Sequence, residues 1–328
     1  MPKPRRLLFP KTAVFITTRT EEGLPFIPAT FMNRILESVL ARAQSLYPVT
    51  ISGFKFMNNH LHMLLVVNGP NDVVGFMSRI KTESGHAVNH LLGRKRHTVW
   101  QEGYDSPPIL TPEDVVSKLI YLYTNAQSAN LVSTIEEYPN VNSWKMFTSG
   151  VCQKVCKWIQ RPMIPKLSKT NLSISEQNEF TENLLAKAKK EHTLTLSPDA
   201  WLSCFKITEP QEIEEYRKKV IDGVREAEKQ LIEKRTAENK HVIGTEKLLA
   251  QPIDVPYTPK KFGRRMWCIC WDRKLRIQFI QQVKILLTDA RKVLERWKVG
   301  DTQAKYPLGL FPPSMPKQAN LLFFEYSS

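Results

Sequence analysis

Residues 56–67 read FMNNHLHMLLVV and place two histidines, one residue apart, at the start of an apolar run. Successive side chains of a β-strand point to opposite faces, so positions two apart share a face. His60 and His62 therefore share one face with Leu64 and Val66. Two neighbouring imidazoles at a strand end are either part of a metal site or two polar residues at a frayed edge. Their spacing fits both interpretations.

The sequence around this stretch alternates between strand and helix patterns. Strand character is found at 13–20 and on both sides of the turn-prone Asn58-Asn59 pair. Helical periodicity covers 27–47, 71–92 and 111–132, whereas 97–110 is irregular or strand-like. The last of these helices has a strong start, because Thr111 is followed by Pro112, Glu113 and Asp114. This order predicts an α+β fold, a small sandwich of helices on an open sheet.

The pattern changes after about residue 150. Residues 166–180 are polar and typical of a linker, and 209–240 predict a highly charged helix, interpreted as a solvated arm. Residues 274–300 predict an amphipathic helix. We therefore expect three parts: a first domain at 1–150, a connecting segment at 151–208, and a mainly helical, basic extension at 209–328.

The charge of the chain is concentrated near its C-terminus. The net charge is +15, and residues 258–298 hold twelve basic and three acidic residues. Cations interleaved with Trp267 and Trp271 suit a nucleic-acid surface, because cations contact phosphates and rings stack on bases. The alternative is a solvated basic helix whose aromatic residues belong to the core.

Other features of the composition narrow the class of protein. No apolar run approaches the ~18 residues of a membrane span, and the first fifteen residues lack a secretory signal pattern. Five cysteines are an odd number and do not suggest a disulfide framework. We expect a cytoplasmic protein with no membrane contact.

The helix predicted at 111–132 offers a partner for the two histidines. Tyr121 and Asn125 are four residues apart and lie off its apolar stripe, whereas Tyr123 falls on the core side. If this face meets His60 and His62, then Asn125 and the histidines form a mixed nitrogen and oxygen site. Such a site suits Mg²⁺ or Mn²⁺ as well as zinc. Tyr121 is then placed to attack a phosphodiester. Otherwise one Tyr and one Asn on a helix are ordinary surface residues.

The order and spacing of these motifs resemble the single-tyrosine HUH (His-hydrophobe-His) transposases, most closely the REP-associated type. The family carries His-hydrophobe-His after Met-Pro-Asn, a Trp-Gln-x-x-Tyr stretch, and Tyr-x-x-x-Asn followed by Pro. This chain has Asn58 and Ala126 in place of the two prolines, which alters loop and helix-end geometry and removes no candidate catalytic group. The matching positions are Met57 to His62, Trp100, Gln101, Tyr104, Tyr121 and Asn125.

The resemblance implies a ferredoxin- or RRM-like nuclease core and a metal-dependent, single-stranded DNA endonuclease and strand transferase. It implies Tyr121 as the nucleophile that forms a 5′-phosphotyrosine, with His60, His62 and Asn125 as ligands of Mg²⁺ or Mn²⁺. The substrate expected from the family is hairpin-forming repeat DNA, at the nucleoid. Whether the protein is a monomer or a homodimer stays open.

The basic residues predict where DNA binds, in three groups along the chain. The first group lies at the N-terminus, the second follows the helix at 71–92, and the third lies in the basic extension. The predicted DNA-binding residues are Arg5, Arg6, Arg94, Lys95, Arg96, Lys260, Lys261, Arg264, Arg265, Trp267, Trp271 and Arg273.

Several alternatives compete with this assignment. The chain could be a DNA-binding regulator that keeps the fold and lacks the chemistry, or, with less support, a zinc hydrolase. Tyr104 is a rival nucleophile, although the resemblance makes it structural or DNA-facing. His86 and His90 are spaced for zinc on a helix, and two cysteine pairs could form a second zinc site: Cys152 with Cys156, and Cys268 with Cys270. No phosphate-binding loop or dinucleotide motif occurs, so we expect no nucleotide cofactor.

Overall fold

The computed structural model describes residues 7–24, 29–95, 97–255 and 266–311. Its strands are β1 (Thr12–Arg19), β2 (Thr50–Met57), β3 (His60–Val67), β4 (Gln153–Lys157) and β5 (Glu191–Thr195). Its helices are α1 (Thr30–Leu46), α2 (Pro70–Leu91), α3 (Pro112–Ser128), α4 (Trp144–Ser149), α5 (Ile174–Lys187), α6 (Pro210–Ala237), α7 (Thr245–Leu249) and α8 (Arg273–Lys298), with short 3₁₀ turns at Glu21–Gly23, Arg161–Met163 and Ala200–Phe205. The predicted α+β class with a helical C-terminal region is confirmed.

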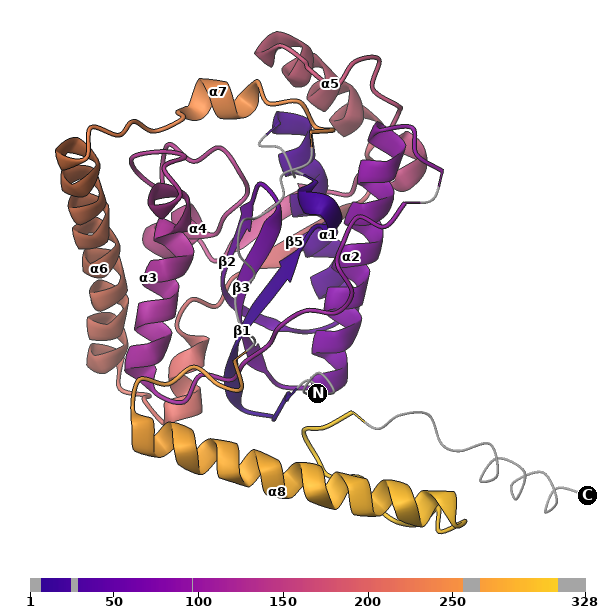
Figure 1. The fold of residues 1–328 in the computed structure, drawn as a ribbon. Coiled ribbons are helices and arrows are strands. Elements are labelled where there is room, and N and C mark those ends of the chain that lie inside the picture. The colour runs from indigo at the N-terminus through magenta and orange to yellow at the C-terminus, as the bar shows by residue number, and fades with distance from the viewer. Residues whose placement is uncertain (1–6, 25–28, 96, 256–265, 312–328) are drawn as a thin grey trace, which may run out of the picture.

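An antiparallel sheet in the order β1-β3-β2 forms the centre of the molecule. β3 is the middle strand because its alternating side chains are apolar on both faces, and nearly all are buried. Figure 1 shows α1 and α2 on one side of this sheet and α3 on the other. The helix α3 approaches closely at Gly53, where an added Cβ would lie 3.0 Å from Leu119 Cδ2. The sheet face that carries the histidines is therefore covered by the helix that carries Tyr121.

Two further segments extend the sheet beyond β1 without forming regular strands. The backbone of 100–109 pairs with β1 at isolated positions, where two consecutive prolines prevent a continuous ladder. The segment 266–272 then lies beside it, since the Ile269 N–H donates to the Pro108 carbonyl and the Leu110 N–H donates to the Ile269 carbonyl. A segment from the C-terminal part of the chain is thus part of the sheet edge next to α3.

The segment predicted to be a linker contains regular structure. Between 151 and 208 the chain forms the β4–β5 hairpin and α5, and these elements share the core with α1. Helix α5 starts with a capping box, in which the Ser173 hydroxyl accepts from Glu176 N and the Glu176 carboxylate accepts from Ser173 N. The linker-like composition of 166–180 was misleading, and this Ser-x-x-Glu signature was the better indicator. The division of the chain into domains stays a prediction.

The charged helix predicted as a solvated arm also packs against the rest of the protein. One face of α6 lies along α3, with Val220 and Val224 fully buried. The same face buries two charged side chains, Glu228 and Arg235. Arg235 donates to the Gln127 carbonyl near the end of α3 at 2.9 Å, in addition to the backbone N–H of Asn130. The interpretation as a solvated arm is therefore wrong for this face.

The helix α8 has the amphipathic stripe that the sequence predicts, and it forms a second, smaller cluster. Val283 and Ala290 are buried against Leu7 and Leu310, which come from opposite ends of the chain. The Trp297 indole N–H donates to the Ala304 carbonyl at 2.8 Å and so fixes the turn after the helix. Within the described residues, no helix combines the length and apolar character that crossing a bilayer requires.

Candidate functional site

The two histidines lie side by side at the start of β3, with ring centroids 4.7 Å apart. His62 is 3% exposed, whereas His60 is half-buried at the end of the strand. The His60 Nδ1 lies 2.7 Å from Asn59 Oδ1, and the His62 Nδ1 lies 3.0 Å from Thr17 Oγ1. An amide oxygen only accepts, so the His60 Nδ1 carries the proton and its Nε2 keeps a lone pair.

Burial sets the charge state of both imidazoles. It lowers the pKa of His60 to about 3, and Arg19 and Lys55 add to this effect. It lowers the pKa of His62 well below the ordinary value, with His60 and the same two cations contributing further. Both rings are therefore neutral near pH 7, which is the form that binds a metal ion.

The helix α3 brings Tyr121 to this pair. Its ring meets His62 edge-on at a centroid distance of 5.4 Å, and Phe15 stacks on His62 from β1 at 5.3 Å. Tyr121 is 42% exposed, so this side chain is partly open to solvent. The Asn125 Nδ2 donates to the Tyr121 hydroxyl at 3.1 Å, which leaves the side-chain oxygen of Asn125, Oδ1, for another partner. Tertiary structure thus joins Tyr121 and Asn125 to the histidines.

Two cations near Tyr121 were missed by sequence reasoning. The Lys118 Nζ lies 5.1 Å from the centre of the Tyr121 ring, and Arg19 pairs with His60 across the β1–β3 ladder. Partial burial raises the pKa of Tyr121, whereas Arg19 and the Asn125 hydrogen bond oppose that rise. The spacing of Lys118, Tyr121 and Asn125 at i, i+3 and i+7 was the available signal, because such residues share a helix face.

Tyr104, the rival nucleophile, and Tyr123, which is two residues from Tyr121, are both buried. Tyr104 is 6% exposed and lies in the core, away from solvent. Tyr123 is fully buried, as its place on the core side of the helix predicts, and its hydroxyl is 2.9 Å from the Ser143 hydroxyl. Of Tyr104, Tyr121 and Tyr123, Tyr121 is the exposed one, and it lies beside the histidine pair.

The predicted alternative zinc sites do not form clusters. The cysteines are unpaired thiols, and Cys156 lies on β4 while Cys268 and Cys270 lie at the edge beside Ile109. In the part of the chain that the structure describes, no three His, Cys, Asp or Glu side chains gather as a metal site. His90 accepts a hydrogen bond from Arg161 at 2.9 Å, so its Nε2 is already used. The expected ligand set at His60 and His62 differs from these because its third member is an amide.

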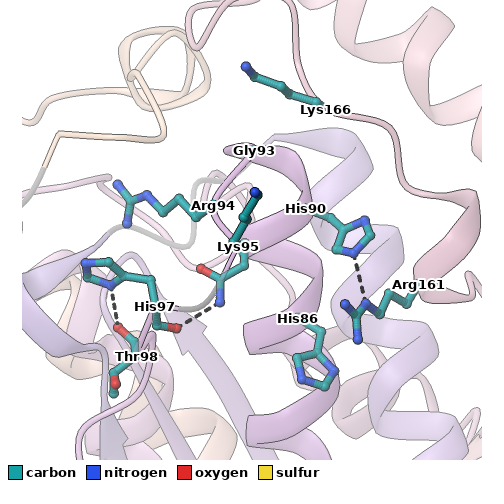
Figure 2. A pocket seen from close by; sticks show the side chains of 10 residues that line it. His86, His90, Gly93, Arg94, Lys95, His97, Thr98, Arg161 and Lys166 are labelled. Atoms are coloured by element: carbon teal, nitrogen blue, oxygen red, sulfur yellow. Dashed lines mark hydrogen bonds between the residues drawn. The ribbon is translucent and has the colours of Figure 1, made fainter.

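The predicted DNA-binding residues fall into two places, and many lie outside the described residues. Arg94 and Lys95 line a basic cavity at the end of α2 (Figure 2). Trp267 and Trp271 line a groove together with Lys118, and Trp271 is 82% exposed. Arg273 is exposed at the start of α8. The predicted residues outside the described ranges are Arg5, Arg6, Arg96, Lys260, Lys261, Arg264 and Arg265.

The fold is α+β, with an antiparallel sheet whose histidine pair faces a tyrosine on a helix. Residues 18–127 match the family described as "Transposase IS200 like". The match covers about a third of the chain and runs from the end of β1 to the last turn of α3. This match confirms the resemblance to the single-tyrosine transposases that the sequence motifs indicate.

Comparisons with whole proteins add little beyond this family. A comparison with curated proteins finds no match. Among solved structures, the chain is similar to a REP-associated tyrosine transposase bound to a REP hairpin, with 19% sequence identity and a TM-score of 0.40. This similarity covers 45% of the present chain and 86% of the other.

Proposed function

We propose that this protein is a metal-dependent single-stranded DNA endonuclease and strand transferase that uses Tyr121 as its nucleophile. The observation that carries the proposal is the exposed Tyr121 side chain, whose hydroxyl accepts from Asn125 and whose ring lies against the neutral histidine pair. The family match over 18–127 includes these four residues and supports the same chemistry. The substrate that we propose is single-stranded or hairpin-forming DNA, handled in the cytoplasm at the nucleoid.

The donor set fits a divalent cation such as Mg²⁺ or Mn²⁺. The His62 Nε2 is a buried atom with no hydrogen-bond partner in the structure, and such orphans are rare unless something else binds them. Metal-binding histidines commonly use their other nitrogen on a protein oxygen, as His60 and His62 do on Asn59 and Thr17. The third ligand atom would be the side-chain amide oxygen of Asn125, Oδ1. When bound, the cation would polarise the scissile phosphate and offset the charge that develops on it.

The residues of the chain then divide the remaining tasks. Asn125 orients the Tyr121 hydroxyl, and the positive charge of Arg19 favours the phenolate over the phenol as the proton leaves. The phenolic oxygen forms a bond to phosphorus while the bond between phosphorus and the 3′-oxygen breaks. The 3′-oxygen takes up a proton, which gives a free 3′-hydroxyl and a 5′-phosphotyrosine. One phosphoester replaces another, so no nucleotide energy source is needed.

The groove beside Lys118 supports a DNA-binding role for the C-terminal segment. It is lined by Lys118, Arg276 and two tryptophans, Trp267 and Trp271. The backbone N–H of Trp271 donates to the buried Asp114 carboxylate of α3 at 3.1 Å, so the backbone that carries the exposed indole is anchored to that helix. An exposed ring next to two cations suits an unpaired base and its phosphate. This groove would continue the DNA path away from Tyr121.

The test is covalent capture of labelled single-stranded hairpin DNA in the presence of Mn²⁺. Wild-type protein should form an adduct that survives denaturation, and Tyr121→Phe should not, because it lacks only the attacking oxygen. Tyr216→Phe is the matched control, since it removes a hydrogen-bonded surface hydroxyl on α6, away from the histidines. An adduct that persists in Tyr121→Phe would sink the assignment. A wild-type protein that binds the DNA and never forms an adduct would support the DNA-binding regulator instead.

A further inference from the structure

A strongly basic cavity of about 770 Å³ lies at the C-terminal end of α2 (Figure 2). One wall is formed by residues 93–95, 97 and 98, which follow α2, and the other by Arg161 and Lys166. Its lining includes three histidines and four cationic side chains: Arg94, Lys95, Arg161 and Lys166. Two of these cations come from the stretch between 151 and 208, which the sequence did not connect with ligand binding. The cavity is distinct from the groove beside Tyr121.

Two of the four cations, Arg161 and Lys166, are positioned by contacts with α2 and with the turn that follows it. The Arg161 Nε donates to His90 Nε2 at 2.9 Å, which orients the guanidinium from one side and leaves its two terminal nitrogens out of this bond. The Lys166 side chain passes over Gly93, where an added Cβ would lie 2.6 Å from Lys166 Cε. Gly93 also has φ +64°, a left-handed conformation that favours glycine. Because residue 93 is a glycine, the Lys166 side chain can pack directly against the backbone of the turn after α2.

The second wall is fastened to the end of the helix. The Leu167 N–H donates to the Leu91 carbonyl at 2.9 Å, which satisfies one of the last carbonyls of α2. On the first wall, the Asn89 Nδ2 donates to the His97 carbonyl at 2.8 Å. Both walls are therefore tied to α2, and the cavity is built before any ligand arrives.

The lining selects an anion rather than an apolar or aromatic group. None of the lining residues carries a carboxylate, and apart from imidazoles none has a ring on which a base could stack. Four like charges around one cavity repel each other, and that repulsion is relieved when an anion binds. The groove beside Trp271, by contrast, combines cations with indole rings. The two sites suit different parts of a nucleotide chain.

The cavity lies at the same end of the sheet as the histidine pair. The Glu21 N–H donates to the Val99 carbonyl at 2.7 Å, and the neighbouring Thr20 N–H donates to the Asn59 carbonyl at 2.8 Å. Asn59 precedes His60 and binds its ring. Val99, which follows the cavity lining, is thus linked through residues 20 and 21 to Asn59 at the candidate active site. The helices α2 and α3 lie on opposite faces of the sheet (Figure 1).

We infer that this cavity binds backbone phosphates of the DNA whose scissile phosphate lies at Tyr121. The inference rests on the proposed function in naming DNA as the source of the phosphates and in placing the scissile phosphate at Tyr121, whereas the anion site itself rests on the lining of the cavity. DNA that passes around this end of the sheet would reach Arg161 and Lys166 after leaving the histidine pair. The cavity would hold the nucleic acid without reading its bases, because phosphate contacts carry affinity and register rather than sequence.

The test uses the full chain carrying Tyr121→Phe, so that binding is measured without cleavage. Arg161→Gln and Lys166→Gln are introduced together, which removes two charges and keeps chain length. Anisotropy of a labelled hairpin with a single-stranded flank gives the affinity over a series of salt concentrations. Two lost phosphate contacts should lower the slope of log K against log salt by about 1.4 for single-stranded DNA and about 1.8 for duplex.

The matched control is the pair Lys218→Gln and Lys229→Gln on the exposed side of α6, with the same change of charge. It should leave affinity and slope nearly unchanged, and Arg161→Lys alone should bind as the parent does. An unchanged slope in the cavity variant, or an equal loss in the α6 control, overturns the inference. So does saturable binding of a deoxynucleoside monophosphate by the parent, lost in the cavity variant while its hairpin affinity is unchanged.

This result is separable from the proposed function. A wild-type protein that forms no covalent adduct refutes the endonuclease and leaves the slope measurement standing. A wild-type protein that forms the adduct, together with an unchanged slope in the cavity variant, refutes only the phosphate site.

Discussion

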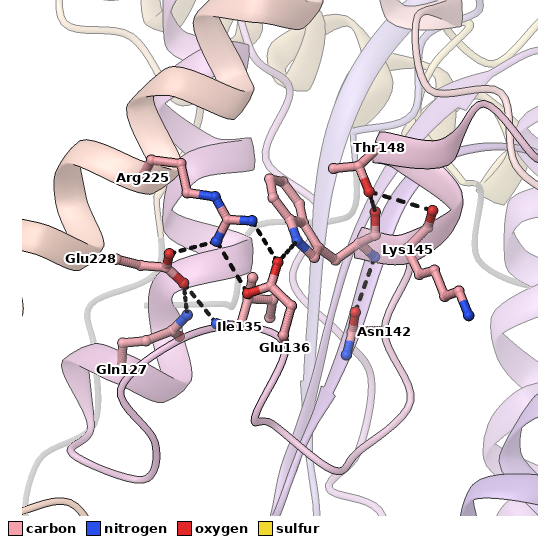
Figure 3. A network of polar contacts seen from close by, with 9 residues as sticks. Gln127, Ile135, Glu136, Asn142, Lys145, Thr148, Arg225 and Glu228 are labelled. Carbon is pink, nitrogen blue, oxygen red and sulfur yellow. Dashed lines mark hydrogen bonds and ion pairs between the residues drawn. The ribbon is translucent and has the colours of Figure 1, made fainter.

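Replacing Glu228 by alanine should loosen the helix that carries Tyr121. Glu228 is 3% exposed and reaches from α6 to the end of α3 and the loop after it (Figure 3). Its Oε1 accepts from the Gln127 Nε2 at 2.8 Å and from the Ile135 N–H at 2.7 Å. Its Oε2 accepts from the Arg225 Nη1 at 2.8 Å. The carboxylate is also the negative charge that favours the protonated form of the fully buried Lys55.

The magnitude follows from what the substitution leaves behind. Two buried donors, on Gln127 and Ile135, lose their acceptor, and each unsatisfied buried group costs roughly 1–3 kcal/mol. Arg225 is about half exposed and can be rehydrated, so it adds little. Together the two unsatisfied donors should lower the free energy of unfolding of Glu228→Ala by about 2–6 kcal/mol. That is a large part of the ~5–15 kcal/mol typical of a domain.

Urea unfolding followed by circular dichroism measures this loss. The control is Glu233→Ala, which removes an exposed carboxylate from the same helix and should change the free energy of unfolding by less than about 0.5 kcal/mol. The reasoning is refuted if the two variants have equal stability. A second readout is the yield of covalent adduct below the unfolding transition, which should fall in Glu228→Ala because α6 no longer braces α3.

Three further predictions address the metal, the exposed indole and the response to acid. His60→Ala should abolish Mn²⁺ binding in calorimetry while DNA affinity stays largely intact, since phosphate contacts elsewhere supply most of it; wild-type metal affinity in this variant would rule out the site. Trp271→Ala should weaken binding of single-stranded DNA by about 1–3 kcal/mol and leave the unfolding midpoint unchanged, because the ring is 82% exposed; unaltered affinity would contradict its stacking role. The hydrogen bond from Arg225, aided by that from the Trp144 indole, lowers the pKa of Glu136 to about 2. The stabilisation from the ionised Glu136 is therefore complete above its ordinary pKa and is lost as pH falls towards 2. Glu136→Gln should then flatten the fall of the unfolding midpoint between pH 5 and 2. Equal pH profiles of the two proteins would count against this contact.

Local sequence patterns were sufficient for the central strand and for the helix that carries Tyr121. The alternation in 60–67 predicts a buried central strand, and the structure pairs that strand on both sides. The start at Thr111 predicts the helix α3, and the Thr111 hydroxyl does accept from the Asp114 N–H. Spacing also separates Tyr121 from Tyr123, because positions two apart on a helix point in different directions. These features depend on neighbours in the sequence, so they could be predicted from it.

The chain after residue 150 shows where local patterns are insufficient. Only a few apolar residues on α6, among them Val220 and Val224, indicate a buried face within a helix that is otherwise charged. Its burial depends on α3, which presents a complementary face about one hundred residues earlier in the chain. A charged helix with a narrow apolar stripe is therefore ambiguous until its partner is known.

The sequence by itself determined the central strand with its histidine pair, the helix with Tyr121 and Asn125 on one face, and the excess of positive charge. Only the tertiary structure decided which of these residues meet. It set Tyr121 against His62, brought the segment at Trp271 to the sheet edge beside Lys118, and joined Arg94 with Arg161 around one cavity. The physical reason is that periodicity describes which face of an element is apolar. Contacts between distant elements depend instead on how those faces pack together in three dimensions.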